Sequence, residues 1–224
     1  MTALFEDLRA LYARRSSARG FRSEPVPRDQ LTALFASAQH APSWCNTQPW
    51  RAVVTEPPRT AAITAALVAA ATSRMPAPEV AFPTSYPEPY AAHRRACGGA
   101  LYEAMGVGRR DGEGRKAAWL RNYQAFDAPH LAIVSCEREL GPYAYLDVGV
   151  WLGYLLAAAE SLGLATCPMA SVVAYPETLR EHLPIAASEV LLFGLAIGQR
   201  DDAVAANACR TRREPVEANV QFIA

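Results

Sequence analysis

Apolar residues recur at helical spacing in three segments of the chain. The first begins just after Pro27 and ends before Pro42, and its apolar positions follow the i, i+3, i+4, i+7 rule: Leu31, Leu34, Phe35 and Ala38. An Ala-rich helix is expected over 59–72. Residues 145–162 predict a long helix that is apolar nearly all round and ends at Gly163. Such a helix must be buried, either in a core or in a subunit interface.

Other apolar runs have the character of strands. Short strands are expected at about 50–55 and at 130–135, and residues 189–197 form a near-continuous apolar run typical of a strand buried on both faces. Residues 216–223 are a weak strand candidate. The alternation of helices and strands predicts an α+β fold in a single domain that spans residues 1–224.

The middle of the chain, about residues 75–125, departs from this regular pattern. It opens with a Pro-rich stretch and continues as charged, Gly-punctuated sequence. Its length favours a functional lid or insertion that covers the active site over a mere connection.

Composition excludes several classes of protein. The 224 residues are 51% apolar and 20% charged with zero net charge, so binding to nucleic acid or to an anionic membrane has no electrostatic support. The N-terminal residues carry acidic groups and predict no signal peptide, and the longest apolar stretch is too short to span a bilayer. The five widely spaced cysteines predict reduced thiols in a cytoplasmic protein, with neither a disulfide framework nor a metal site.

Two polar features stand out against this background. Asn46 and Gln48 lie in a Pro-bounded turn, where their carboxamides suit the alternating N–H and C=O groups of a flat heterocycle. Residues 14–19 gather three arginines and two serines, which can hold a phosphate or can be a solvated turn. The basic tail 210–213 allows the same two interpretations.

The order of these motifs resembles the nitroreductase family of FMN enzymes. The pattern R-x-S-x-R-x-F, then P-S-x-x-N-x-Q-P-W, then R-T-x-R-x-P matches Arg15, Ser17, Arg19, Phe21, Pro42, Ser43, Asn46, Gln48, Pro49, Trp50, Arg210, Thr211, Arg213 and Pro215. The long helix and the turn that follows it, 162–168, are also similar to the family's central helix.

The resemblance implies a three-layer sandwich, with a central mixed sheet flanked by helices, in an intertwined homodimer with two FMN sites at its interface. Arg15, Ser17 and Arg19 would bind the FMN phosphate together with Arg213. The other subunit would contribute its residues 42–46, and residues 168–171 would line the flavin ring, with a backbone amide pointing at N5. The full set of expected cofactor residues is Arg15, Ser16, Ser17, Arg19, Pro42, Ser43, Trp44, Asn46, Gln48, Pro168, Met169, Ala170, Ser171, Arg210 and Arg213.

Two residues depart from the family pattern, and because of them the pattern does not predict which substrate is bound. Trp44 is bulkier than the small residue common at its position, and Ala170 stands where many relatives carry an acidic side chain. The resemblance implies reduction of nitroaromatics, quinones or similar flat acceptors by NAD(P)H through flavin N5, with no catalytic side chain required. Alternatives are oxidase, dehalogenase or flavin-processing chemistry on the same fold, or a non-catalytic flavin-binding module. The sequence names neither the acceptor nor the choice between NADH and NADPH.

Other residues that could carry chemistry also have structural interpretations. The scattered histidines favour structural roles, and Cys167 is either a redox thiol or a small buried hydrophobe. The aromatic residues of the 75–125 segment either pack a lid over the flavin or form a satellite core. Its arginines either recognise an anionic substrate or form a solvated face.

Overall fold

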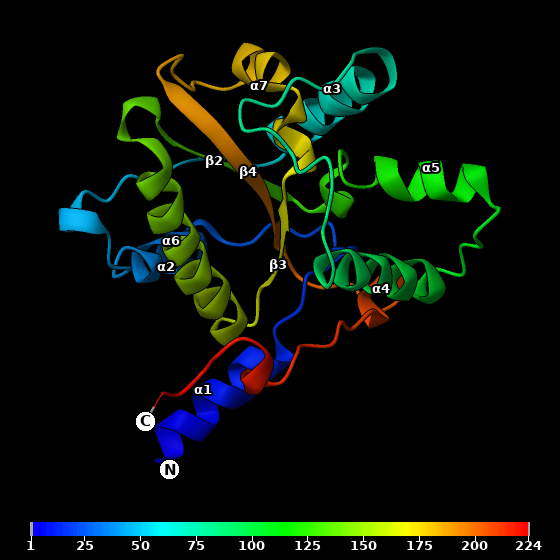
Figure 1. The fold of residues 1–224 in the computed structure, drawn as a ribbon. Helices are drawn as coiled ribbons and strands as arrows, with labels where there is room; N and C mark the ends of the chain where they lie inside the picture. The colour runs from blue at the N-terminus through cyan, green and yellow to red at the C-terminus, as the bar shows by residue number, and fades with distance from the viewer. Residues whose placement is uncertain (1, 224) are drawn as a thin grey trace.

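The computed structural model describes residues 2–223 and arranges them in three layers around a four-stranded sheet (Figure 1). The strands are β1 (Arg51–Val54), β2 (His130–Glu137), β3 (Ala165–Met169) and β4 (Glu189–Gly198). They pair in the order β1-β2-β4-β3, and all three pairings are antiparallel. The sheet is therefore antiparallel and not mixed as expected, because each strand-to-strand pairing reverses the chain direction; the parallel bridge from Ser17 to Thr166 is isolated and lies outside the named strands.

Helices cover both faces of this sheet, as expected. They are α1 (Ala3–Arg14), α2 (Arg28–Ala38), α3 (Arg59–Ser73), α4 (Tyr90–Ala104), α5 (Gly112–Leu120), α6 (Gly141–Ser161) and α7 (Pro176–His182), with short 3-10 turns that include η1 (Trp44–Asn46), η4 (Ser171–Ala174) and η5 (Ala205–Ala208). Helices α2 and α6 pack together on one side of the sheet, and α3 and α7 pack on the other (Figure 1).

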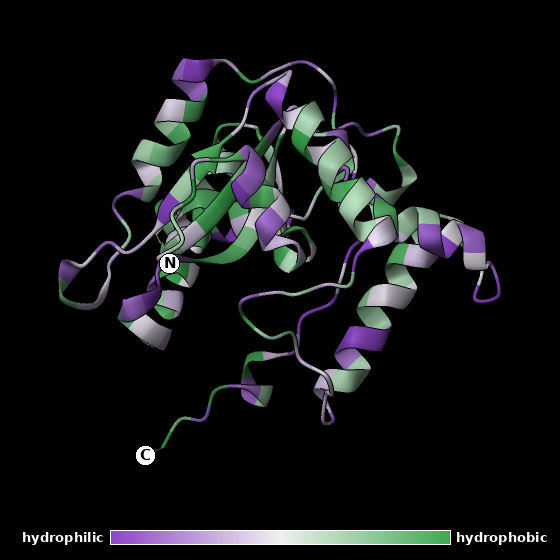
Figure 2. Cartoon of the chain, turned by 90° about the horizontal axis from the view of Figure 1, so that it is seen from above, coloured by the Kyte–Doolittle hydropathy of each residue, from purple (hydrophilic) through white to green (hydrophobic). Residues whose placement is uncertain are grey.

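The strands supply a core to each side because successive side chains point to opposite faces. In β2, Leu131 and Ile133 pack with the α3 and α7 side, whereas Ala132 and Val134 pack with α2 and α6. Hydrophobic residues accordingly concentrate in the central sheet in Figure 2. A large apolar side chain that is fully buried contributes about 1.5–3 kcal/mol, so these two cores are the main source of stability.

Helix α6 is apolar nearly all round but is buried on only one side within the chain. Its inner face consists of the buried residues Ala144, Val148, Trp151, Leu155 and Ala159. Its outer face carries Tyr143, Leu146, Val150 and Tyr154, which are 41–65% exposed. The helix begins at Gly141, four residues before the expected start, and is followed by Gly163 with φ of 71°. Glycine suits that left-handed position, as expected for a helix stop.

The structure corrects three expectations. Strand β3 was not expected, because Pro168 interrupts a short run, yet proline is tolerated at a sheet edge where no ladder N–H is needed. The 75–125 segment holds two helices, α4 and α5, joined by a short loop. The strand expected at 216–223 is wrong, since Val216–Ala218 form a 3-10 turn and no strand is assigned to the described residues there. No helix within residues 2–223 is long and apolar enough to cross a membrane.

Candidate functional site

Three of the residues expected to bind phosphate converge on strand β3. The segment after α1 runs beside the outer edge of this strand, where the Ala18 N–H donates to the Thr166 carbonyl at 2.9 Å. Burial raises the pKa of the neighbouring Cys167 thiol, whereas the positive charge of Arg19, a hydrogen bond with the Ser17 hydroxyl and the positive charge of Arg15 each lower it. Burial nevertheless dominates and raises the pKa of Cys167 to about 11. The thiol therefore stays protonated at neutral pH, as expected of a small buried hydrophobe.

A buried asparagine that sequence reasoning missed fixes this segment to the end of the chain. The Asn207 side chain accepts from the Arg19 N–H at 2.6 Å and donates to the carbonyls of Gly20 and Asp201, both at 2.8 Å. Asn207 is only 5% exposed, and its place in the Ala-rich run 203–208 was the available signal. Arg200 also joins the two segments, donating to the Ser16 hydroxyl at 2.5 Å.

The two tail arginines are held differently. Arg210 donates to the Asn207 carbonyl at 2.7 Å, which links it to the same cluster. The hydrogen bonds of Arg213 within residues 2–223 stay inside the tail, with the Thr211 hydroxyl at 2.7 Å. The structure thus brings Arg210 toward the Arg15–Arg19 segment and leaves Arg213 turned onto its own backbone.

The turn expected to line a flavin ring follows directly on β3. Pro168 and Met169 end the strand, Ala170 is exposed, and Ser171 opens η4. The Ser171 hydroxyl oxygen is buried and has no hydrogen-bond partner among the described residues. A buried hydroxyl without a partner is costly, so this turn has hydrogen-bonding capacity available for a ligand.

The Asn46 turn stands beside helix α6. The Trp44 N–H donates to the Asp147 carboxylate at 3.1 Å, and the Trp44 ring packs against Tyr143 with centroids 5.0 Å apart. The Gln48 side chain donates to the Asn46 carbonyl at 3.1 Å, so Gln48 steadies the turn itself. Trp44 is 62% exposed, and Pro42, Ser43 and Asn46 lie on the same projecting turn.

Within one chain these two groups of expected site residues lie apart. The Asn46 turn leads into β1 at one edge of the sheet, whereas the Arg15–Arg19 segment and the 168–171 turn lie at β3, the other edge. Three strand spacings, about 14 Å, separate those edges. Figure 1 shows η1 as the light-blue turn at the left margin, well away from β3.

A cavity of about 500 Å³ opens beside Arg19 beneath the 75–125 segment, which we call the lid. Helices α4 and α5, the turn at Phe126 and η5 form its walls. Most of the lining is apolar, and the polar side chains are Arg19, Arg121 and Asn122. This volume lies in the range of small-molecule sites and suits a flat ring. The lid thus covers a cavity that includes one of the expected cofactor residues.

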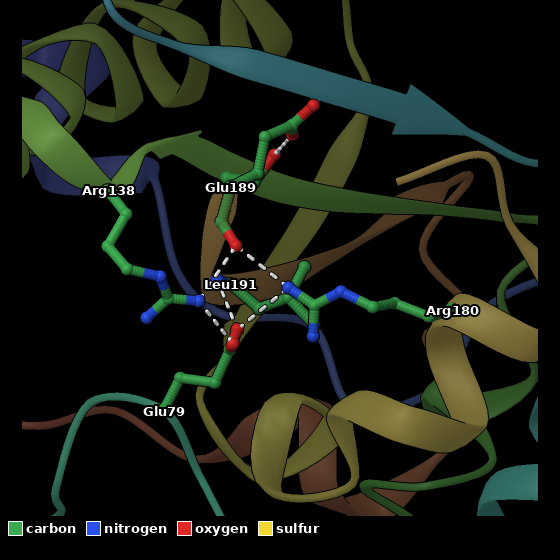
Figure 3. A network of polar contacts seen from close by, with 6 residues as sticks. Glu79, Arg138, Arg180, Glu189 and Leu191 are labelled. Atoms are coloured by element: carbon green, nitrogen blue, oxygen red, sulfur yellow. Dashed lines mark hydrogen bonds and ion pairs between the residues drawn. The ribbon is translucent and has the colours of Figure 1, made fainter. Parts of the chain in front are cut away.

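The start of the lid is anchored by Glu79 (Figure 3). Its carboxylate pairs with Arg138 at 2.6 Å and Arg180 at 3.1 Å, and accepts from the Leu191 N–H at 2.9 Å. Burial alone would raise the pKa of Glu79, but these donors together outweigh it and hold the pKa below its ordinary value. Both arginines also donate to the Glu189 carbonyl, which fastens the lid to β4.

The other candidates take structural roles. Tyr123 of the lid is buried in the core on the α3 and α7 side, where it contacts Tyr175, so it belongs to the main core rather than to a satellite. All five cysteines are free. No group of three or more potential metal ligands occurs within the described residues.

The fold is of the nitroreductase class, with helices on both faces of an antiparallel sheet, a basic segment along β3 and a polar turn at the opposite sheet edge, and the chain belongs to the nitroreductase family. The family profile, described as Nitroreductase family, matches residues 12–199.

Individual relatives match over nearly the whole chain. The chain is 31% identical over 212 residues to the chloronitrobenzene nitroreductase of Comamonas testosteroni, covering 93% of each protein. It is 32% identical over 226 residues to the 4-nitrobenzoate reductase of Nocardioides sp., covering 96% of this chain and 89% of that one. Among solved structures, the FMN-dependent nitroreductase NfnB from Mycobacterium smegmatis, in complex with NADPH, superposes with a TM-score of 0.95 at 27% identity, covering 99% and 100% of the two chains.

Proposed function

We propose that this protein is an FMN-dependent oxidoreductase that uses NAD(P)H to reduce nitroaromatics, quinones or similar flat acceptors. Family membership and the nitroaromatic reductases among its relatives support this activity. The observation that carries the proposal is the convergence of Arg15, Ser17 and Arg19 at the edge of β3, next to a turn whose buried Ser171 hydroxyl has no partner.

These residues fit the chemistry of FMN. Guanidinium and hydroxyl groups are the donors that a phosphomonoester prefers, and charge-assisted hydrogen bonds are the strong ones. Arg15, Ser17 and Arg19 would hold the phosphate, with Arg210 and Arg213 supplying further charge from the tail. The 168–171 turn would lie against the ring and offer backbone amides and the Ser171 hydroxyl. When bound, the flavin supplies the hydride chemistry, so the chain's own task is to bind, orient and shield it.

The test is the cofactor content of the purified protein. It should be yellow and carry about one FMN per subunit. Arg19→Ala should weaken FMN binding roughly ten- to a hundredfold, because one charge-assisted contact contributes about 1.5–3 kcal/mol. Exposed Arg22 on the same segment provides the matched control, as Arg22→Ala should leave the affinity unchanged. Unaltered FMN affinity in Arg19→Ala would remove Arg19 from the site, and a colourless protein that binds no added FMN would refute the function.

The same proposal includes a homodimer in which each FMN site draws on two subunits. The outer face of α6, with Leu146, Val150 and Tyr154, is an exposed apolar stripe that continues to Trp44 through Tyr143. Among residues 2–223, strand β1 pairs with a strand on only one side, and the tail residues Val216, Val220, Phe222 and Ile223 expose apolar surface that can extend toward a second subunit. An obligate interface of this kind buries more than about 2,000 Å².

A mixed dimer tests the shared site directly. In a heterodimer of an Arg19→Ala chain and an Asn46→Ala chain, a shared arrangement leaves one site fully intact and one doubly damaged. Half of the FMN should then bind with wild-type affinity, although each parental homodimer binds weakly at both sites. If each site belonged to a single chain, every site in the mixed dimer would be damaged and no tight fraction would appear.

A further inference from the structure

The lid carries a positive charge that the rest of the chain balances. Across the lid, residues 75–125, there are seven arginines and lysines against five acidic residues, in a protein whose net charge is zero. Two of these cations are neutralised locally, since Arg95 pairs with Glu88 at 2.7 Å and Arg121 pairs with Asp127 at 2.7 Å. The surplus charge therefore lies on the remaining lid cations.

Three of the remaining arginines lie close in sequence to residues that line the lid cavity. Arg109 and Arg110 are exposed in the loop between α4 and α5, and they lie in sequence between the cavity residues Val107 and Gly114. Arg115 is the next residue along α5. None of the three forms an ion pair within residues 2–223. We call Arg109, Arg110 and Arg115 the arginine rim.

Arg115 is held in position without being neutralised. Its guanidinium carbon lies 4.1 Å from the centroid of the Tyr102 ring, so the cation stacks between α5 and α4. Stacking on an aromatic face engages the plane of a guanidinium and leaves its N–H edges free, and those edges fit phosphate oxygens bidentately. A preorganised cation of this kind loses less side-chain freedom when it binds an anion.

We propose that the arginine rim binds the 2′-phosphate of NADPH and so selects NADPH over NADH. The proposal rests on the function proposed above and names its electron donor. Of the two cavity-lining arginines, Arg121 is already paired with Asp127 and Arg19 belongs to the proposed FMN phosphate site. The surplus charge therefore lies outside the apolar space that suits a ring. A dinucleotide matches this layout, because its adenosine phosphates extend well beyond its nicotinamide. A small anionic acceptor would need the charge inside the cavity.

The decisive measurement compares the two donors on variants of the FMN-loaded protein. Wild-type protein should reduce its flavin more efficiently with NADPH than with NADH in anaerobic stopped flow. The double variant Arg109→Gln/Arg110→Gln, and separately Arg115→Gln, should lower the NADPH/NADH efficiency ratio at least tenfold. The matched control is Arg94→Gln, because Arg94 is also stacked on a tyrosine, 5.2 Å from the Tyr86 centroid, but lies near the start of α4, away from the cavity-lining Leu101 and Met105.

A binding measurement independent of turnover completes the test. By calorimetry, wild-type protein should bind 2′,5′-ADP at least tenfold more tightly than 5′-AMP, and the rim variants should lose that difference. Equal binding of the two nucleotides by wild-type protein, or an unchanged donor ratio in both rim variants, would overturn the proposal. A flavin that neither NADPH nor NADH reduces would instead refute the proposed function, so the two failures are distinguishable.

Discussion

The Nε2 atom of His130 accepts a hydrogen bond from the backbone N–H of Val26 at 2.9 Å, joining two segments 104 residues apart. On the other side of the ring, Nδ1 lies 3.0 Å from the Thr55 carbonyl and must carry the proton. The imidazole is 1% exposed and forms a structural bridge between β2, the end of β1 and the chain before α2. This agrees with the structural role expected for the histidines.

His130→Phe should therefore destabilise the fold. It leaves the Val26 N–H and the Thr55 carbonyl buried without partners, at a cost of about 2–4 kcal/mol in the free energy of unfolding. Urea denaturation measures this, and exposed His40→Phe is the control. A change below about 0.5 kcal/mol would show that water or a backbone shift satisfies both groups.

Glu79→Gln should loosen the lid and change the acid stability. The variant keeps the size of the side chain but leaves Arg138 and Arg180 without their anion, and we expect a loss of about 2 kcal/mol. Because the pKa of Glu79 is depressed in the folded state, the wild-type carboxylate contributes stability above its ordinary pKa of 4.5 that is lost as the pH falls through its folded pKa. Glu79→Gln should remove that part of the acid dependence.

Hydrogen exchange reports on the same anchor. Backbone amides of residues 76–89 should exchange faster in Glu79→Gln than in wild-type protein. Glu88→Gln removes an exposed lid carboxylate that pairs with Arg95, and should leave this exchange unchanged. Equal protection in both variants would mean that other contacts hold the lid.

Two buried thiols should make the protein sensitive to alkali. Burial raises the pKa of Cys136 to about 11, and that of Cys167 to the same value. Stability from a raised acid pKa is complete below the unfolded value near 9 and is lost as the pH rises toward 11. The free energy of unfolding should fall across this window by about 2 kcal/mol per thiol, and Cys167→Ser should lessen the fall.

Thiol labelling checks the same environment at neutral pH. Exposed Cys97 should react promptly with Ellman's reagent, while Cys136 and Cys167 should react only after unfolding. Rapid labelling of Cys167 in the folded protein would favour the redox role left open by the sequence.

Asn207→Leu should weaken FMN binding without a direct contact to the phosphate. The substitution removes the acceptor for the Arg19 N–H and the donors to Gly20 and Asp201, so the attachment of the Arg15–Arg19 segment to residues 200–207 is weakened, with the Arg200–Ser16 hydrogen bond remaining. We expect at least a tenfold loss of FMN affinity and a lower melting temperature. Asn207→Asp, which retains the acceptor, should keep more of the affinity. Asn219→Leu, on the exposed tail, is the control, and equal affinities in all variants would contradict the role.

Residues whose environment is local were the ones that could be predicted from sequence. The helical spacing of Leu31 and Leu34 and the stop at Gly163 depend on neighbours within a few positions, and both agree with the structure. Strand β3 was missed because its pairing with β4 lies about 30 residues away, and Pro168 argues locally against a strand. The 216–223 strand failed because exposed apolar residues alone do not specify a partner strand.

The candidate site divides in the same way. The motif residues Arg15, Ser17 and Arg19 lie together because they share one short segment. The turn 168–171 could be predicted because it follows closely after the long helix in the sequence. Asn207 and Glu79 were missed since each acts across more than 100 residues, on Arg19 and on Leu191. A polar residue in an apolar run, such as Asn207, is the signal that sequence reading can use.

Helices α4 and α5 have no fully buried residue, although they roof the cavity beside Arg19. Substitutions at exposed positions usually change stability by less than about 0.5 kcal/mol, whereas those in the two cores around the sheet cost several times more. Helices α4 and α5 can therefore accumulate amino-acid substitutions that would unfold the rest of the chain. New acceptor preferences in this lineage should arise by mutation of α4 and α5 first, while the sheet and the basic segment along β3 stay constant.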